Sequence, residues 1–351
     1  IMAYTTIDNP GLFFNTVLWT GDGASTRSIT GVGFQPDWIW VKCRSTGHDH
    51  YSWDSVRTNK KGLEPSDTSA ERTPTLGSID SDGFSFASLD SFYNANSDTY
   101  VGWNWRAGNS SGSSNGDGSI TSTVSANTTA GFSVVSYTGT GSNATVGHGL
   151  GAIPKWIITK RYDGATENWG VYHAGLGNTK YVFLNKTNTA ATSSAYWNDT
   201  TPTSSVFSIG TNDVVNTSSG VYIAYCFAEI KGYSKFGTYT ANANTDGPFV
   251  YTGFKPAWVL VQNTDIAQGW YLLDNKRDTF NQVQKSLAPH NSSTENDSSA
   301  NNGCDFLSNG FKVRAVGTGD INHTSGNNYI YMAFAETPFV TEGTKAAGTA
   351  R

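Results

Sequence analysis

The 351-residue sequence has little charge and few segments that favour a helix. Charged residues make up 15% of the chain, and stretches rich in Ala, Leu, Glu and Lys are nearly absent. Aromatic residues reach 13%, and Gly occurs 38 times among abundant Ser, Thr and Asn. Aromatic and β-branched side chains suit a pleated, half-buried surface, whereas Gly and Asn suit turns. The composition therefore predicts an all-β protein with many short strands.

Other absences exclude classes of partner. Lys and Arg number 23 against 28 Asp and Glu, a net charge of -5, so no cationic face is expected for nucleic acid. No apolar run approaches the roughly 20 residues of a spanning helix, so a membrane is not an expected partner. Cys43, Cys226 and Cys304 are odd in number and irregularly spaced, which favours buried free thiols over a disulfide framework.

One ten-residue segment occurs three times. "GFQPDWIWVK" begins at Gly33, "GAIPKWIITK" at Gly151 and "GFKPAWVLVQ" at Gly253. Each copy also has an aromatic-Thr pair at the same distance before its proline, and each ends on an aromatic segment: "YVGWNW", "YIAYCF" or "YIYMAF". The residues that we expect to be structural, because they recur in every copy, are Pro36, Trp38, Phe84, Pro154, Trp156, Phe207, Pro256, Trp258 and Phe311.

The repeated unit has the length of an ordinary domain. We therefore expect three tandem antiparallel β-sandwich domains of one repeat type, with jelly-roll or Ig-like connectivity, each burying its own core. Their expected bounds are 1–108, 132–234 and 235–340, followed by a C-terminal tail at 341–351. Segment 109–131 is rich in Gly, Ser, Asn and Thr and is expected to be an exposed linker with one short strand. The first joint would then swing, and the shorter second joint would be tight.

Both faces of the segment "PDWIWVK" are apolar. Trp38 and Trp40 share one face of an extended strand, and Ile39 and Val41 share the other. Such a strand needs cover on both sides, so it is expected at the centre of a sheet with its proline at the first position.

The repeats resemble a known family. The segments "DGSITSTVSANTTAGFSVVSYTGTG", "VGHGLGAIPKWIITK", "GFKPAWVLVQ" and "YIYMAFAETPFV" are similar to a repeat-domain family of uncharacterised function. That family occurs in structural, tail-fibre-like proteins of tailed bacteriophages, notably marine phages and cyanophages. The resemblance covers nearly the whole chain and implies a location in the virion.

Catalytic, cofactor and metal sites are not predicted. We expect no nucleophile on a strained Gly-x-Ser-x-Gly elbow, and "GLGNTK" lacks the ending of a phosphate-binding loop. Asp54 and Asp274 each stand three residues before an arginine, which predicts an ion pair or a turn. The second unit has His173 at that place. His48-Asp49-His50 is the only cluster with zinc-ligand types, and a surface loop is the preferred interpretation.

The expected function is that of a non-enzymatic virion protein, either a tail-fibre or a surface-decoration component. Its expected partners are other copies of itself, other virion proteins and host surface glycans, and no cofactor is expected. The alternatives are a host-glycan-binding adhesin, a polysaccharide depolymerase and an extracellular bacterial fibre subunit. The aromatics that we expect in loops, where they would contact sugars, are Tyr51, Tyr93, Tyr162 and Trp197.

Overall fold

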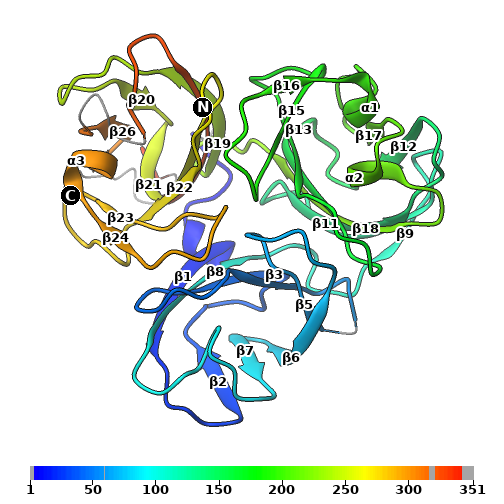
Figure 1. Ribbon diagram of the computed structural model, residues 1–351, viewed down its shortest axis with the longest axis horizontal. Helices are drawn as coiled ribbons and strands as arrows, with labels where there is room; N and C mark the ends of the chain where they lie inside the picture. Colours follow the sequence, from blue (N-terminus) through cyan, green and yellow to red (C-terminus); the bar gives the residue numbers. More distant parts are fainter. Residues whose placement is uncertain (1–3, 59, 316–320, 342–351) are drawn as a thin grey trace.

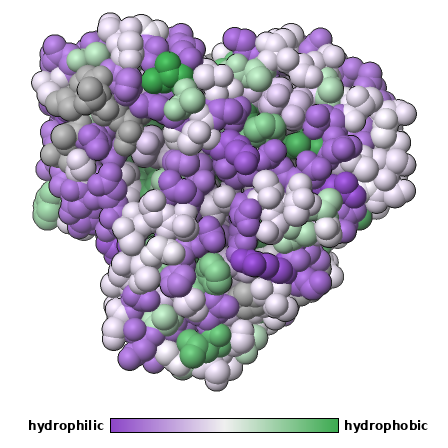
Figure 2. Space-filling model, viewed as in Figure 1, coloured by the Kyte–Doolittle hydropathy of each residue, from purple (hydrophilic) through white to green (hydrophobic). Residues whose placement is uncertain are grey.

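The computed structural model describes residues 4–58, 60–315 and 321–341. The chain is all-β, and its strands form three groups arranged around a common centre (Figure 1). Every pair of named strands is antiparallel, as the composition predicts. On the face shown in Figure 2, apolar residues occur only as small separate patches. Among the described residues, no helix has the length and apolar character needed to cross a membrane.

The elements follow the three sequence units. The first unit contains η1 (Pro10–Leu12), β1 (Phe14–Thr20), β2 (Arg27–Thr30), β3 (Trp38–Cys43), β4 (Tyr51–Asp54), β5 (Lys61–Gly62), β6 (Arg72–Asp80), β7 (Gly83–Phe86) and β8 (Thr99–Trp105). The second contains β9 (Ser113–Asn115), β10 (Ser122–Asn127), β11 (Phe132–Thr138), β12 (Ala144–Gly147), β13 (Pro154–Arg161), β14 (Gly170–His173), β15 (Lys180–Phe183), β16 (Ala191–Thr192), α1 (Ser194–Trp197), β17 (Val206–Ile209), α2 (Asp213–Asn216) and β18 (Val221–Ala228). The third contains β19 (Ser234–Thr240), β20 (Phe249–Tyr251), β21 (Phe254–Asn263), β22 (Trp270–Asp274), β23 (Lys285–Ser286), β24 (Asn296–Asp297), α3 (Ser299–Asn302), β25 (Cys304–Leu307), β26 (Gly310–Val313) and β27 (Asn328–Pro338).

Each unit has an inner sheet with the same strand order. The orders are β1-β8-β3-β4, β11-β18-β13-β14 within a larger sheet, and β19-β27-β21-β22. The first strand therefore pairs with the last in every unit. In an Ig constant domain the first strand lies beside the second, so the Ig-like alternative does not describe this order. An outer sheet accompanies each inner one: β2-β7-β6-β5, β12-β17 and β20-β26-β25.

The two faces of β3 point into two different cores. Ile39 and Val41 lie in a local core between the two sheets of the first unit, whereas Trp38 and Trp40 lie in a core that all three units share. The strand is central, between β8 and β4, as predicted. The predicted place of the proline holds only for Pro154, which is the first residue of β13.

Each unit has a local core, and the repeated phenylalanines Phe84, Phe207 and Phe311 belong to the three different ones. The three cysteines are buried and free, which confirms the expectation from their spacing. Each lies in the local core of its own unit.

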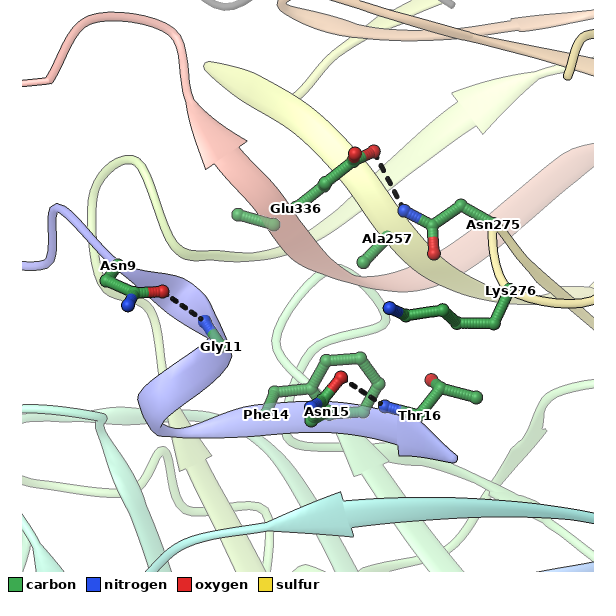
Figure 3. A pocket seen from close by; sticks show the side chains of 10 residues that line it. Asn9, Gly11, Phe14, Asn15, Thr16, Ala257, Asn275, Lys276 and Glu336 are labelled. Atoms are coloured by element: carbon green, nitrogen blue, oxygen red, sulfur yellow. Dashed lines mark hydrogen bonds between the residues drawn. The ribbon is translucent and has the colours of Figure 1, made fainter. Parts of the chain in front are cut away.

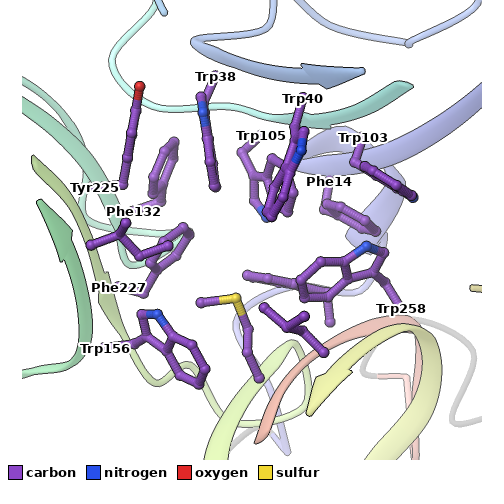
Figure 4. Close-up of a cluster of buried hydrophobic side chains, with 14 of the residues drawn as sticks. Phe14, Trp38, Trp40, Trp103, Trp105, Phe132, Trp156, Tyr225, Phe227 and Trp258 are labelled. Carbon is purple, nitrogen blue, oxygen red and sulfur yellow. The ribbon is translucent and has the colours of Figure 1, made fainter. Parts of the chain in front are cut away.

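The inner sheets close on one shared aromatic core (Figure 4). Trp38 stacks on Tyr225 of the second unit with 4.3 Å between ring centroids. Trp105 packs edge-on against Trp258 of the third unit at 5.6 Å. We expected each unit to bury its own core and to be self-sufficient. Each unit does have a local core, but the additional shared core shows that the units are not self-sufficient. The inner face of each sheet is too apolar to meet water, so the units bury these faces against one another.

Segment 109–131 is not an exposed linker. Its strand β10 pairs with β11 of the second unit, and β9 pairs with β10. The buried carboxylate of Asp37, in the first unit, accepts hydrogen bonds from the N–H groups of Ala107 at 2.7 Å and Asn109 at 3.0 Å. It also accepts the hydroxyl of Ser125 at 3.4 Å. These contacts fix the joint that was expected to swing.

Candidate functional site

Three of the four aromatics expected to contact sugars are covered by protein, and the fourth is partly covered. Tyr51 and Tyr93 are 0% exposed and Trp197 is 1% exposed. Tyr162 is partly buried against the shared core, and the guanidinium of Arg57 lies 5.6 Å from its ring centroid. Tyr51 also begins a strand rather than occupying a loop. Because a sugar stacks on an open ring face, Tyr51, Tyr93 and Trp197 do not have the exposure that a glycan contact needs.

The repeated prolines and tryptophans also line no open groove. Trp38, Trp156 and Trp258 lie in the shared core with at most 1% exposure. Pro36, Pro154 and Pro256 are buried at or beside the central strands. The three tryptophans therefore pack between units.

Buried aspartates form a recurring charged contact between units. Asp54 pairs with Arg57 at 2.7 Å, and Asp274 pairs with Arg277 at 2.6 Å, which confirms the predicted ion pairs. Each aspartate also accepts a hydrogen bond from the next unit. Tyr225 Oη donates to Asp54 Oδ2 at 3.0 Å. The equivalent bond to Asp274 Oδ2 comes from the indole Nε1 of Trp103, also at 3.0 Å.

The second unit replaces this aspartate with His173. Strand register places Met332 of the third unit at the position of Trp103 and Tyr225, and a thioether donates no hydrogen bond. An aspartate in the second unit would therefore lack the donor that the other two have. Burial lowers the pKa of His173 to about 3, so the imidazole is neutral. Its Nδ1 accepts the N–H of Gly175 at 2.9 Å.

His50, from the zinc-ligand cluster considered above, is a packing residue. It is wholly buried, its Nδ1 accepts the indole N–H of Trp40 at 3.0 Å, and its Nε2 lies 3.1 Å from the carbonyl of Ala288. Trp169 and Trp270 hold the same position in the other units and likewise donate to a carbonyl of a neighbouring unit. Within the described ranges, no three His, Cys, Asp or Glu side chains are grouped so as to hold a metal ion.

One stretch does have the letters of a nucleophile elbow. Residues 108–112 read "GNSSG", which the expectation from sequence overlooked. Ser110 is exposed, and its Oγ accepts the N–H of Gly112 at 3.2 Å. An elbow requires a strand, a turn and a helix, whereas this stretch runs into β9. No described histidine hydrogen-bonds Ser110, so the stretch has the letters of the motif without its structure.

A small polar cavity lies between the first and third units (Figure 3). Its volume is about 160 Å³, below the 300 Å³ or more of typical ligand pockets. Asn275 Nδ2 donates to Glu336 Oε2 at 2.8 Å across one wall. Lys276 follows Asn275 on the third unit, and Asn15 of β1 lies on the opposite side. The cavity offers hydrogen bonds but has little room for a ligand.

A larger groove opens at the side of the third unit. Its volume is about 470 Å³, and it lies between β19 of the inner sheet and β20 of the outer sheet. Phe249 and Tyr251 line it and are 46% and 56% exposed. The equivalent residues are Ser28 and Thr30 in the first unit and Thr145 and Gly147 in the second. Aromatic residues therefore occupy these two positions only in the third unit. This departure from the repeat is the sequence feature that would have indicated the groove.

The comparisons with known proteins give a family. The family described as "Domain of unknown function (DUF7483)" matches residues 9–338. The chain belongs to this family. The match extends over all three units as one domain and ends with β27. No curated protein and no solved structure matches the chain. The family is one of unknown function, as the resemblance implied.

Proposed function

We propose that this DUF7483 chain is a non-enzymatic structural protein of a phage virion, a tail-fibre or surface-decoration component that assembles with copies of itself and with other virion proteins. The observation that carries the proposal is the shared core. Three units that bury their tryptophans against one another form one rigid body, which suits a part that must keep its shape outside a cell. The sequence resemblance to phage structural proteins supports the same role.

We further infer that each unit is a β-sandwich of the jelly-roll kind. The inner and outer sheets lie on opposite sides of a local core in each unit, and the chain moves between the two sheets. These features support a sandwich repeated three times and modified by the shared core.

The alternatives have less support. Of the four aromatics expected to contact sugars, the fold buries Tyr51, Tyr93 and Trp197 and partly buries Tyr162. Neither a polysaccharide depolymerase nor a bacterial fibre subunit is favoured by an observation on the described residues. We therefore retain the structural role.

The location is tested by quantitative mass spectrometry on cultures that produce the chain. Density-gradient-purified phage particles and sheared cell-surface filaments are prepared from the same culture. The proposal predicts that the chain co-purifies with the particles in a fixed ratio to the other virion proteins. Recovery in the filament fraction, with none in the particles, would contradict it.

A further inference from the structure

The groove of the third unit has a filled counterpart in the second unit. There, residues 118–127 lie along the edge of the inner sheet and reach the outer sheet. Val124 pairs with Val135 of β11, and the N–H of Ile120 donates to the carbonyl of Thr145, in β12, at 3.0 Å. Ser122 Oγ donates to the carbonyl of Gly147 at 2.8 Å. One extended segment thus bridges the two sheets of this unit.

The segment also closes the local core of the second unit. Ile120, Ser122 and Val124 alternate inward and are at most 7% exposed. Ser119, Thr121 and Thr123 alternate outward and are exposed. The occupant of the site is therefore an uncharged strand with aliphatic or small residues on its inner face and hydroxyl residues on its outer face.

The third unit presents the same edge without an occupant among the described residues. The N–H of Ala241 donates to the carbonyl of Asn327. Because every second residue of an antiparallel strand hydrogen-bonds the same neighbour, Tyr239 and Gly237 also form main-chain hydrogen bonds with β27. Phe236 and Thr238 then direct their N–H and C=O groups toward the groove. In the part of the chain that the structure describes, no residue hydrogen-bonds these main-chain groups on that side. Their counterparts in the second unit, Val134 and Ser136, pair with β10.

The opposite wall of the groove, formed by β20, is also uncovered among the described residues. Phe249 and Tyr251 are the counterparts of Thr145 and Gly147, whose carbonyls the covering segment binds in the second unit. In the third unit the residues at these positions expose aromatic side chains. Two solvent-exposed aromatic side chains beside a strand edge without a hydrogen-bonded neighbour form a surface that a partner would bury.

We propose that the groove between β19 and β20 binds an extended, uncharged segment of another polypeptide by strand addition, in the way that residues 118–127 cover the second unit. Main-chain bonds to Phe236 and Thr238 would supply affinity, and Phe249 and Tyr251 would select small or aliphatic side chains. The first unit is less suited, because Asn15 Nδ2 on its edge strand already donates to the carbonyl of Val32 at 3.0 Å. This inference does not depend on the proposed virion function.

The test uses a fluorescein-labelled peptide with the sequence of residues 118–127, GSITSTVSAN, titrated with the full chain by fluorescence anisotropy. Saturable binding is expected, and a scrambled peptide should not bind. Thr238→Pro removes the N–H that faces the groove and leaves the ladder to β27 intact, because its neighbours make those bonds. It should weaken binding by about tenfold.

The matched control is Leu18→Pro, which makes the same change on the edge strand of the first unit and should leave the affinity unchanged. If Thr238→Pro fails to fold by circular dichroism, Tyr251→Glu places a charge in the groove and should also weaken binding by about tenfold. Absence of saturable binding would overturn the proposal. So would a loss of affinity in Leu18→Pro alone, or glycan-array binding that depends on Tyr251 when the peptide does not bind.

Discussion

At the scale of single residues, two buried lysines mark the joints between units. Lys42 and Lys160 occupy equivalent positions and donate to main-chain carbonyls of a neighbouring unit at 3.3 Å and 2.9 Å. Gln262 stands at the same position in the third unit and also donates to a neighbouring carbonyl, at 3.2 Å. Burial lowers the pKa of both lysines to about 8. This position therefore requires a hydrogen-bond donor to the neighbouring unit, but not a positive charge.

The lysines therefore make stability depend on pH. Because their folded pKa lies below the ordinary value of 10.5, the unfolded chain binds more protons above pH 8, and the free energy of unfolding should rise with pH. We expect a gain of roughly 1 kcal/mol per lysine between pH 8 and pH 9, relative to the double variant Lys42→Gln/Lys160→Gln, measured by urea unfolding. The variant places at both positions the glutamine that the third unit has there, and its free energy of unfolding should not show this rise with pH. Parallel pH profiles for both proteins would show that the lysines are not the cause.

The buried ion pairs should be costly to break. Asp274→Ala leaves the buried guanidinium of Arg277 with only the Glu295 carboxylate, at 3.1 Å, and leaves the indole N–H of Trp103 without its acceptor. We therefore expect a loss of about 3 kcal/mol in the free energy of unfolding. The control is Asp246→Ala, which removes an ion pair with Lys312. The side chain of Asp246 is 81% exposed. It should cost less than about 1 kcal/mol in urea unfolding at neutral pH. Equal losses in the two variants would mean that burial does not determine the cost.

At the scale of elements, Asp37 should hold β9 and β10 in place. Asp37→Ala removes the acceptor of the Ala107 and Asn109 N–H groups, and each unmet buried donor costs about 1–3 kcal/mol. We expect faster amide hydrogen exchange across residues 107–127, measured by mass spectrometry. Asp82→Ala, which removes an exposed acceptor in the first unit, should leave that region unchanged. Exchange of β10 at the rate of an unfolded peptide in the unsubstituted chain would contradict this account.

The elements also show what the sequence could predict. Alternation in "PDWIWVK" predicted a central strand covered on both faces, and β3 is one. The pattern gives the apolar character of each face but does not identify what covers it, so the shared core was missed. In segment 109–131 the expected short strand is present as β10, but the abundant Gly and Ser did not indicate that it pairs with β11 and is part of the second unit. Sugar contacts were misplaced because aromatics outside the repeat pattern, such as Tyr93 and Trp197, turn inward.

At the scale of the whole molecule, the repeat predicted three units but not their dependence on one another. Each inner sheet carries aromatics on two neighbouring strands, such as Trp40 on β3 and Trp103 on β8. The local core of the first unit lies on the opposite face of this sheet, so only the other two units cover these rings. The units should therefore fold together.

Differential scanning calorimetry of the full chain tests this claim most directly. Because the shared core is lost when any unit opens, we predict one unfolding transition whose calorimetric and van't Hoff enthalpies agree. Independent units would each unfold separately. Two or three resolved transitions, or a calorimetric enthalpy well above the van't Hoff value, would contradict a single body built around one core.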